Sequence, residues 1–255
     1  MSFKVVIPAR WESSRLPHKP LADVGGAPLV VRCLEVGRRA GAEEVRVAVD
    51  DARIAEAVRA AGGVADLTSP DHQSGTDRLA EVADALGWDD DAIVVNLQGD
   101  EPLVPPRLLG ILAGALVERP DVGIATMACP IRDAAELCAQ SAVKVVLAAD
   151  GRALYFSRAP IPWSRGWTPS PEGDLPEGVP YLRHLGLYAY RVSTLRRVAA
   201  ADRSAPERAE SLEQLRAMHL GVPIHVTVID AAPPPGVDTP EDLERVRRQF
   251  EEAAR

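Results

Sequence analysis

Three basic residues, Arg10, Arg15 and Lys19, lie close together near the start of the chain. Two serines accompany them in the segment 7–20, which continues directly from the apolar run Lys4–Ala9. A polyphosphate needs this combination of fixed positive charge, bidentate guanidinium donors and backbone N–H groups that can approach closely. Because the segment contains neither GxGxxG nor a Walker motif, the dinucleotide-binding and P-loop interpretations are excluded. A basic surface loop remains the open alternative.

Two aspartates that are far apart in the chain could supply a metal site. Asp100 comes shortly after the apolar run Ala92–Leu97, and Asp238 lies between the last predicted strand and the last predicted helix. Mg²⁺ is a hard cation that proteins bind through one or two carboxylates together with phosphate oxygens and water. On the residues alone, a turn position for Asp100 and a helix-start position for Asp238 stay open.

The first half of the chain must place these groups, and it alternates between strand and helix patterns. Continuous apolar runs predict buried strands, and proline openers and glycine stops predict the helices between them. The predicted strands are Lys4–Ala9, Val45–Val49, Val64–Leu67 and Ala92–Leu97, and the predicted helices are Pro28–Ala40, Ala52–Ala61, Gly75–Leu86 and 105–119. This alternation predicts an α/β fold with a mostly parallel sheet covered by helices on both faces. Ligands bind such sheets beyond the carboxyl ends of the strands, where the basic segment begins.

The second half of the chain has more strands and fewer helices. Asp150-Gly151 indicates a hairpin between two of the strands, and the proline-rich segment 160–180 is expected to be a long loop. The predicted strands are Val122–Cys129, Val143–Ala149, Ala153–Phe156, Tyr181–Arg191 and Ile224–Ile229; the predicted helices are Ser193–Ala201, one from Pro206 to Gly221, and Pro240–Ala254. We therefore expect a Rossmann-like core, about 1–130 and 222–255, with a smaller mixed-strand insertion, about 131–221.

The composition excludes several classes of protein. Apolar residues make up 46% and charged residues 26% of the 255 residues, which is typical of a globular protein, and the formal net charge is −8. A duplex-binding protein usually presents a basic face, so nucleic acid is not expected as a partner. The three cysteines match no zinc or disulfide pattern, the N-terminus has no signal-peptide pattern, and no run approaches the roughly 20 apolar residues of a membrane span. We expect a cytoplasmic protein without a membrane partner.

The segment 7–20 resembles the sugar-nucleotide transferase signature I-P-A-R-x-x-S-x-R-L-P-x-K-P-L. Further stretches resemble the 3-deoxy-D-manno-octulosonate (Kdo) cytidylyltransferases, the CMP-Kdo synthetase family. They are DHQSGTDR at 71–78, NLQGDEP at 96–102, VKVV at 143–146, YFSRAPIPW at 155–163, RHLG at 183–186, LEQL at 212–215 and GVDTP at 236–240. Each stretch is weak alone, but their order along the chain makes the match specific. His18 departs from the signature, which usually has glycine there, and its side chain is expected to crowd the loop.

This resemblance implies a nucleotidyltransferase that uses CTP and Mg²⁺ to make CMP-Kdo for lipopolysaccharide or another cell-surface glycan. It implies that Asp100 and Asp238 are the metal ligands, and catalytic roles for Arg10, Arg15, Lys19 and Asp100. Arg10, Arg15 and Lys19 are expected to contact the phosphates, and His72, Ser74, Arg78 and Gln98 to border the base. The nucleotide-binding set is Pro8, Ala9, Arg10, Ser13, Arg15, Lys19, His72, Ser74, Gly75, Arg78 and Gln98.

The sugar acid needs a guanidinium for its carboxylate and side-chain acceptors for its hydroxyls. The resemblance implies sugar-binding roles for Arg158, His184, Glu213 and Gln214, and Tyr188 is a candidate from the same half of the chain. A histidine paired inside a strand, a solvated helix face and a core tyrosine are the competing interpretations of these residues.

Two other functions stay open on the sequence. The acceptor could be a different 2-keto-3-deoxy sugar acid, such as a sialic acid or an amino-sugar analogue, or the chain could be a non-catalytic nucleotide-binding module. The resemblance also suggests a homodimer. The length and composition of segment 160–180 suggest a lid over the site.

Overall fold

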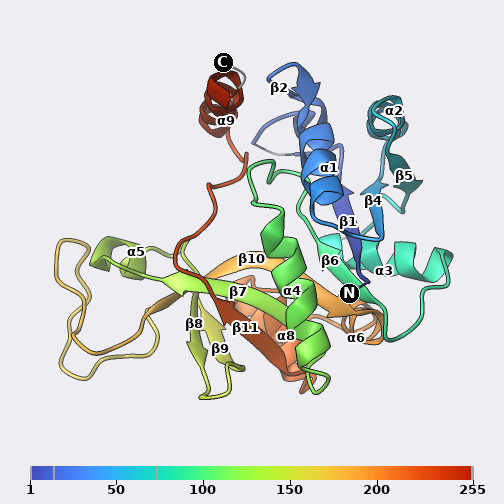
Figure 1. Cartoon of the computed structure of the whole chain (residues 1–255). Helices are drawn as coiled ribbons and strands as arrows, with labels where there is room; N and C mark the ends of the chain where they lie inside the picture. The colour runs from blue at the N-terminus through green and yellow to red at the C-terminus, as the bar shows by residue number, and fades with distance from the viewer. Residues whose placement is uncertain (1, 14, 73, 254–255) are drawn as a thin grey trace.

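A computed structural model describes residues 2–13, 15–72 and 74–253 of the chain. Ser14 and Gln73, which belong to two of the sequence motifs, lie outside the described residues. The first half alternates strand and helix as predicted (Figure 1). Its main elements are β1 (Lys4–Ala9), α1 (Leu29–Arg39), β4 (Glu44–Val49), α2 (Ala52–Ala60), β5 (Val64–Leu67), α3 (Gly75–Ala85), β6 (Ile93–Asn96) and α4 (Arg107–Glu118).

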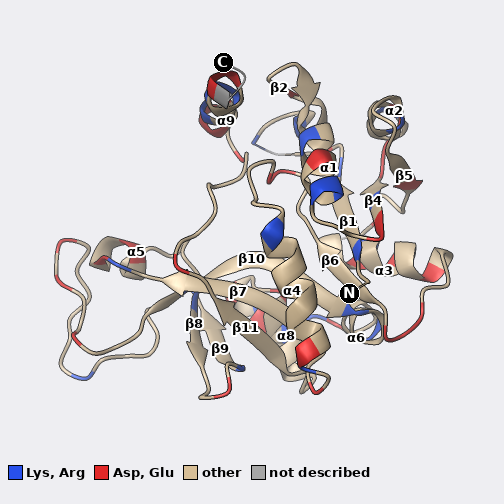
Figure 2. Cartoon of the chain, in the orientation of Figure 1, with Lys and Arg blue, Asp and Glu red and all other residues tan. Residues whose placement is uncertain are grey.

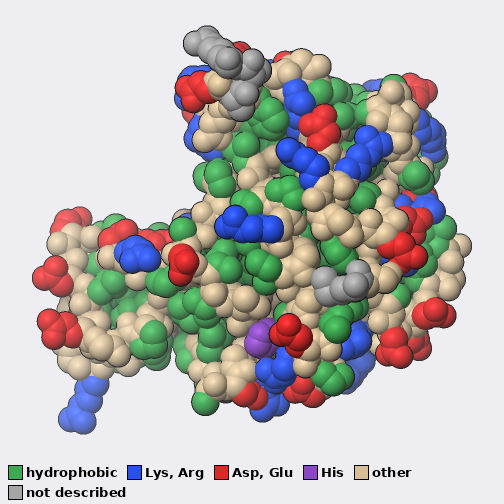
Figure 3. Space-filling model, in the orientation of Figure 1, with side chains coloured by type: hydrophobic (Ala, Val, Ile, Leu, Met, Phe, Trp, Pro, Cys, Tyr) green, Lys and Arg blue, Asp and Glu red, His purple; other side chains and the backbone are tan. Residues whose placement is uncertain are grey.

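The second half contains the predicted strands and additional short helices. Its elements are β7 (Ile124–Pro130), α5 (Ala134–Cys138), β8 (Lys144–Leu147), β9 (Ala153–Ser157), β10 (Leu182–Arg191), α6 (Val192–Ala199), α7 (Ala205–Glu210), α8 (Gln214–His219), β11 (Ile224–Val228) and α9 (Pro240–Ala253). As expected, β8 and β9 form an antiparallel hairpin, and segment 160–180 contains neither helix nor strand. With α5, this segment forms an arm that projects from the rest of the molecule (Figure 3).

The main sheet has nine strands among the described residues, and seven of them follow the order β11-β7-β10-β6-β1-β4-β5. Strands β6, β1, β4 and β5 are parallel, as are β7 and β11. Strand β10 runs antiparallel between β6 and β7, and so the segment 131–221 contributes a central strand to the sheet. The fold class is therefore confirmed: an α/β protein with a mostly parallel sheet.

Both faces of the sheet are buried, which explains why the strands are apolar without interruption. In β1, Val5 and Ile7 belong to one apolar cluster and Val6 belongs to another, as expected for side chains that alternate between the two faces of a strand. Helices α1, α2 and α4 pack against the first face, and α3 and α6 against the second.

Helix α9 brings the end of the chain back to its beginning. Leu243 and Val246 pack with Val24, Leu29 and Val237 in a separate buried cluster. Val24 belongs to a small hairpin, β2 (Asp23–Val24) and β3 (Ala27–Pro28), which the sequence patterns did not predict. This packing holds the segment around Asp238 beside the segment 7–20, more than two hundred residues earlier.

The single helix predicted from Pro206 to Gly221 is wrong. The structure divides it into α7 and α8, because Ser211 takes a left-handed backbone conformation with φ 52°. Ser204 and Glu207 form a capping box at the start of α7, and the Glu207 carboxylate also binds Arg216 of α8 at 2.7 Å. Burial raises the pKa of Glu207, but the hydrogen bond and charge of Arg216 outweigh it and lower the pKa below its ordinary value. This pair fixes the corner between the two helices.

Charge is distributed over the whole chain. Figure 2 shows acidic and basic residues interspersed along most elements, and Figure 3 shows both signs mixed over the visible face. Among the described residues, no helix is long and apolar enough to cross a membrane.

Candidate active site

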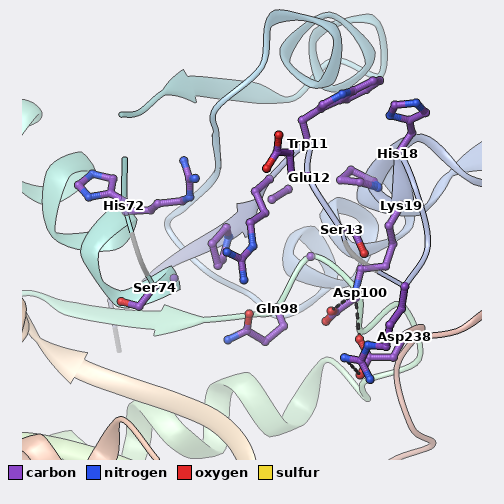
Figure 4. Close-up of a pocket in the computed structure, with 18 of the residues that line it drawn as sticks. Trp11, Glu12, Ser13, His18, Lys19, His72, Ser74, Gln98, Asp100 and Asp238 are labelled. Atoms are coloured by element: carbon purple, nitrogen blue, oxygen red, sulfur yellow. Dashed lines mark hydrogen bonds and ion pairs between the residues drawn. The ribbon is translucent and has the colours of Figure 1, made fainter. Parts of the chain in front are cut away.

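A cavity of about 740 Å³ opens at the carboxyl ends of β1 and β6. All eleven residues predicted to bind the nucleotide line it, together with Asp100 and Asp238: Pro8, Ala9, Arg10, Ser13, Arg15, Lys19, His72, Ser74, Gly75, Arg78 and Gln98. Trp11, Glu12, Pro17, His18, Pro20 and Gly99 line it as well. In Figure 4, Lys19, Asp100 and Asp238 lie at one side of the cavity, His72 and Ser74 lie at the other, and Gln98 lies between them. The charged end of the cavity is therefore the one that carries Lys19, Asp100 and Asp238, and the opposite end carries His72 and Ser74.

Asp50, which sequence reasoning missed, anchors the first limb of the loop 7–20, which is the part around Trp11 that leaves β1. It follows β4, whose end is in register with the end of β1 at the pair Ala9–Val49. Its carboxylate accepts a hydrogen bond from the backbone N–H of Trp11 at 2.8 Å and another from the guanidinium of Arg78 at 2.8 Å. Neighbouring parallel strands end at the same edge of a sheet. An acidic residue directly after the second strand was therefore the signal that could have predicted a partner for the loop.

Arg78 is largely committed to this anchor. Its side chain is 4% exposed, and it also donates to the Thr68 hydroxyl at 2.7 Å and to the Ser69 carbonyl at 3.2 Å. His72, which precedes α3, contacts the carboxylate of Glu81 in that helix. Arg78 therefore shapes the wall of the cavity, whereas Arg10 and Arg15 carry the more available charge in the loop.

Lys19 joins the loop to both aspartates. Its Nζ donates to Asp100 at 2.7 Å, to Asp238 at 3.1 Å and to the Val237 carbonyl at 3.0 Å. Burial lowers the pKa of Lys19, but the charges and hydrogen bonds of the two aspartates outweigh it and raise the pKa above its ordinary value. The Arg15 guanidinium also pairs with Asp238 at 3.2 Å. The ammonium of Lys19 is therefore held in its charged form at the rim of the cavity.

Two glycines allow the three chain segments of this cluster to meet. A Cβ at Gly99 would lie 2.7 Å from the Pro8 carbonyl oxygen, and a Cβ at Gly236 would lie 2.7 Å from the Asp100 carbonyl oxygen. Real Cβ atoms do not approach so closely, so larger residues would separate β1, the turn after β6 and the segment before α9. The Asp100 carbonyl also accepts a hydrogen bond from the Val237 N–H at 2.8 Å.

The two aspartates fit a hard divalent cation. Their carboxylates converge on one Lys19 ammonium from segments that are far apart in the chain, at the edge of a cavity lined by basic residues. Two carboxylates that leave further positions for phosphate oxygens and water match the ligands that Mg²⁺ prefers.

A second cavity of about 110 Å³ adjoins the first, because Gly75 and Gln98 line both. Three residues predicted to bind the sugar line it: Tyr188, Glu213 and Gln214. Glu213 Oε1 and Gln214 Nε2, as well as Oδ1 of the neighbouring Asn96, are buried without a hydrogen-bond partner among the described residues. Buried polar atoms are almost always paired, so these three atoms are available to hydrogen-bond a polar ligand or water in the cavity. Asn96 was missed because it lies inside the predicted buried strand Ala92–Leu97.

His184 lies beside this cavity and does not line it. Its ring centroid is 5.4 Å from that of Tyr188 and 4.9 Å from that of Phe156, and its Nε2 lies 3.0 Å from the Thr126 hydroxyl. Burial lowers the pKa of His184 to about 3. The imidazole of His184 is therefore neutral near pH 7, and its ring packs against that of Tyr188.

The buried His184 is expected to make stability depend on pH. The unfolded chain protonates this residue below about pH 6.5, whereas the folded chain does so only near its pKa of about 3. Between these values the unfolded state binds one more proton, so the free energy of unfolding falls by about 1.4 kcal/mol per pH unit on acidification. Urea denaturation from pH 7 to pH 4 measures the free energy of unfolding. For His184→Gln, its slope against pH is expected to be smaller by about 1.4 kcal/mol per pH unit than for the unchanged protein. The exposed His219→Gln is the control, and an unchanged slope in His184→Gln would contradict the expectation.

Arg158, like His184, lines neither of the two cavities, and it makes a different set of contacts. Its guanidinium donates to the carbonyls of Glu210 at 2.7 Å, Gln140 at 3.0 Å and Ser211 at 3.4 Å. In this arrangement Arg158 supports the corner between α7 and α8, two residues before Glu213. A direct role in sugar binding stays a prediction.

Comparisons with known proteins show the family to which the chain belongs. Residues 4–224 match the family model described as cytidylyltransferase. The chain is 53% identical over 250 residues to a 3-deoxy-manno-octulosonate cytidylyltransferase of Pseudomonas syringae pv. tomato, covering 98% of each chain. It is 52% identical over 246 residues to the enzyme of that name from Hahella chejuensis, covering 96% of each. A solved structure of CMP:2-keto-3-deoxy-manno-octonic acid synthetase complexed with CTP superposes with a TM-score of 0.89 at 44% identity, covering 99% of both chains. From its sequence, its fold and its cavity, the chain belongs to the cytidylyltransferase family and resembles the CMP-Kdo synthetases over nearly its whole length.

Proposed function

We propose that this protein transfers CMP from CTP to Kdo, forming CMP-Kdo and pyrophosphate, with Mg²⁺ as its metal. The relatives named for this reaction align over 96–98% of the chain, and the solved structure was determined with CTP. The observation that carries the proposal is the pair of adjoining cavities, one with Lys19, Asp100 and Asp238 at its rim and one with unpartnered polar atoms.

The larger cavity suits a nucleoside triphosphate. Arg10, Arg15 and Lys19 would contact the phosphates at the charged end, and the base would lie toward His72 and Ser74. The protein does little covalent work in phosphoryl transfer, so its task is to position the reactants and to offset the negative charge of the transition state. Fixed guanidinium and ammonium groups do this without reorganising during the reaction.

Asp100 and Asp238 would hold the metal ion. A bound Mg²⁺ polarises phosphoryl oxygens and offsets their charge. Lys19 balances the charges of the two carboxylates and keeps them together at the rim. The loop and the acidic pair therefore face the same phosphate groups from two sides.

The sugar acid would enter the second cavity, where Glu213, Gln214 and Asn96 offer polar atoms to its hydroxyls. An eight-carbon sugar exceeds about 110 Å³ once its oxygens are included, so it would extend past Gly75 and Gln98 into the larger cavity. That route would bring its anomeric C2 hydroxyl to the α-phosphorus of CTP. Holding both reactants in one orientation supplies much of the rate enhancement in such a transfer.

A pyrophosphate-release assay tests the function. CTP with Kdo is expected to give the fastest release among the common triphosphates and among Kdo, a sialic acid and an amino-sugar analogue. Faster release with a different sugar acid would replace the proposed acceptor. CTP binding without pyrophosphate release from any acceptor would indicate a non-catalytic nucleotide-binding module.

The Glu213→Ala variant is expected to lose sugar-acid activity while it keeps its affinity for CTP. Hydrogen bonds to a charged group contribute about 1.5–3 kcal/mol, which corresponds to a loss of about 10- to 100-fold in kcat/KM for Kdo. The Kd for CTP, measured by calorimetry, should stay within about twofold. Glu118→Ala on the exposed face of α4 is the matched control. A parallel loss of CTP affinity would place Glu213 outside a dedicated sugar site.

The same two measurements on Arg158→Ala test whether this residue belongs to the sugar site. A loss confined to Kdo would support a role in sugar binding, directly or through the α7–α8 corner that precedes Glu213, and an equal loss for CTP and Kdo would place Arg158 outside the sugar site. The homodimer, the cytoplasmic location, the division into a nucleotide core and a sugar part, and closure of segment 160–180 stay predictions.

A further inference from the structure

His18 occupies an unusual backbone conformation in the second limb of the nucleotide loop. Its φ of 56° and ψ of 29° are left-handed, a region that glycine enters freely and that other residues rarely adopt. The residue stands immediately before a short 3₁₀ helix, η1 (Lys19–Leu21), and its carbonyl accepts the Leu21 N–H at 3.0 Å. A non-glycine residue is held in such a conformation only when its surroundings determine it.

The surroundings of His18 include Trp11, in the first limb of the same loop. The imidazole and indole centroids lie 4.1 Å apart at an interplanar angle of 33°. Figure 4 shows the two rings next to each other at one edge of the cavity. The contact therefore joins the limb that leaves β1 to the limb that leads to Lys19.

Trp11 is itself fixed to the body of the protein. Its backbone N–H binds the Asp50 carboxylate at 2.8 Å, and the Arg53 guanidinium lies 3.5 Å from the centroid of its ring. Arg53 is in turn paired with Asp51 at 2.6 Å, at the start of α2. The indole is thus a fixed surface on which the second limb of the loop can rest.

We propose that the Trp11–His18 contact holds the two limbs of the loop in their nucleotide-binding arrangement before CTP binds. Both are positioning residues for the triphosphate, because His18 directly precedes Lys19, and Lys19 reaches Asp100 and Asp238. A loop that is ordered beforehand loses less conformational freedom when the ligand binds. The inference rests on the proposed use of CTP.

Two substitutions of His18 distinguish the effect of losing the ring contact from the effect of straining the backbone. Glycine accepts the left-handed conformation, so His18→Gly removes the ring contact without adding backbone strain, whereas His18→Phe keeps an aromatic ring and removes the titratable group. Aromatic pairs of this kind correspond to about a three- to tenfold effect on an equilibrium. The Kd for CTP of His18→Gly is expected to rise by that factor, with kcat at saturating CTP little changed, and that of His18→Phe is expected to stay within about twofold.

Two further measurements address the loop itself. The Arg15 side chain is 64% exposed, so trypsin can report on the loop at the Arg15–Leu16 bond; without CTP, His18→Gly is expected to be cut there faster than His18→Phe or the unchanged protein. The Trp11→Ala/His18→Gly double variant is expected to bind CTP no more weakly than Trp11→Ala alone, since either change removes the same contact.

The results distinguish this inference from the proposed function. Wild-type affinity and wild-type cleavage in His18→Gly would overturn the inference. A loss of affinity in His18→Phe equal to that in His18→Gly would also overturn it, because the contact between two aromatic rings would then not be what matters. Absence of CTP binding in the unchanged protein would instead reject the proposed function.

Discussion

The Asp100→Asn and Asp238→Asn enzymes are each expected to lose at least about 100-fold in kcat with CTP and Kdo, at any CTP concentration. The substitution keeps the size of the side chain and removes one negative charge from the pair that converges at the rim of the cavity. A metal ion held by two carboxylates stabilises the negative charge of the transition state by several kcal/mol. Losing one ligand therefore lowers turnover more than it lowers the affinity for the nucleotide.

Turnover as a function of Mg²⁺ concentration checks this expectation. Each variant should need more Mg²⁺ to reach half of its own maximal rate. Asp121→Asn is the matched control, because the Asp121 side chain is 54% exposed and paired with Arg119, much as Asp238 is 51% exposed and paired with Arg15. Unchanged kcat and an unchanged Mg²⁺ requirement in either variant would remove that aspartate from the metal site.

Lys19→Met is expected to lower kcat/KM for CTP on the order of 100-fold in a protein that still folds. Lys19 donates to both aspartates, and its charge would be available to the phosphates at the same place. Methionine keeps much of the length and the apolar stem of the side chain and removes the ammonium. The two carboxylates then lose the ammonium that they share, and only Asp238 keeps a second partner, Arg15, which weakens the attraction of the site for a polyanion.

Lys4 provides a matched control for this substitution. It starts the strand whose far end leads to Lys19, it is 16% exposed where Lys19 is 15% exposed, and it also pairs with a carboxylate, that of Glu43 at 3.3 Å. Lys4→Met is expected to change kcat/KM by less than about twofold, because a single ion pair of this kind contributes little. For both Lys19→Met and Lys4→Met, steady-state kinetics measures the activity and circular dichroism checks that the protein is folded. A similar loss in the two would mean that the effect is on folding.

The basic loop at the end of β1 and the fold class could be predicted from the sequence because both depend on local patterns. The segment 7–20 carries its charges within a few residues of a buried strand, and continuous apolar strands indicate a sheet covered on both faces. Turn and helix signals likewise located α1, the β8–β9 hairpin and α9 within one or two residues. The break between α7 and α8 was missed because Ser211 has no glycine-like signal for its left-handed conformation.

Local sequence patterns define which chemical groups the site can contain: the basic loop, the aspartates after strands, and the polar residues of the second half. Packing between distant segments sets which of these groups are available. It committed Arg78 to Asp50, turned Arg158 toward backbone carbonyls, and set His18 against Trp11. It also placed β10 between β6 and β7, which brings Tyr188 into the lining of the second cavity. These outcomes depend on contacts between residues far apart in the chain, and such contacts form only when apolar faces pack and the remaining polar groups must find partners.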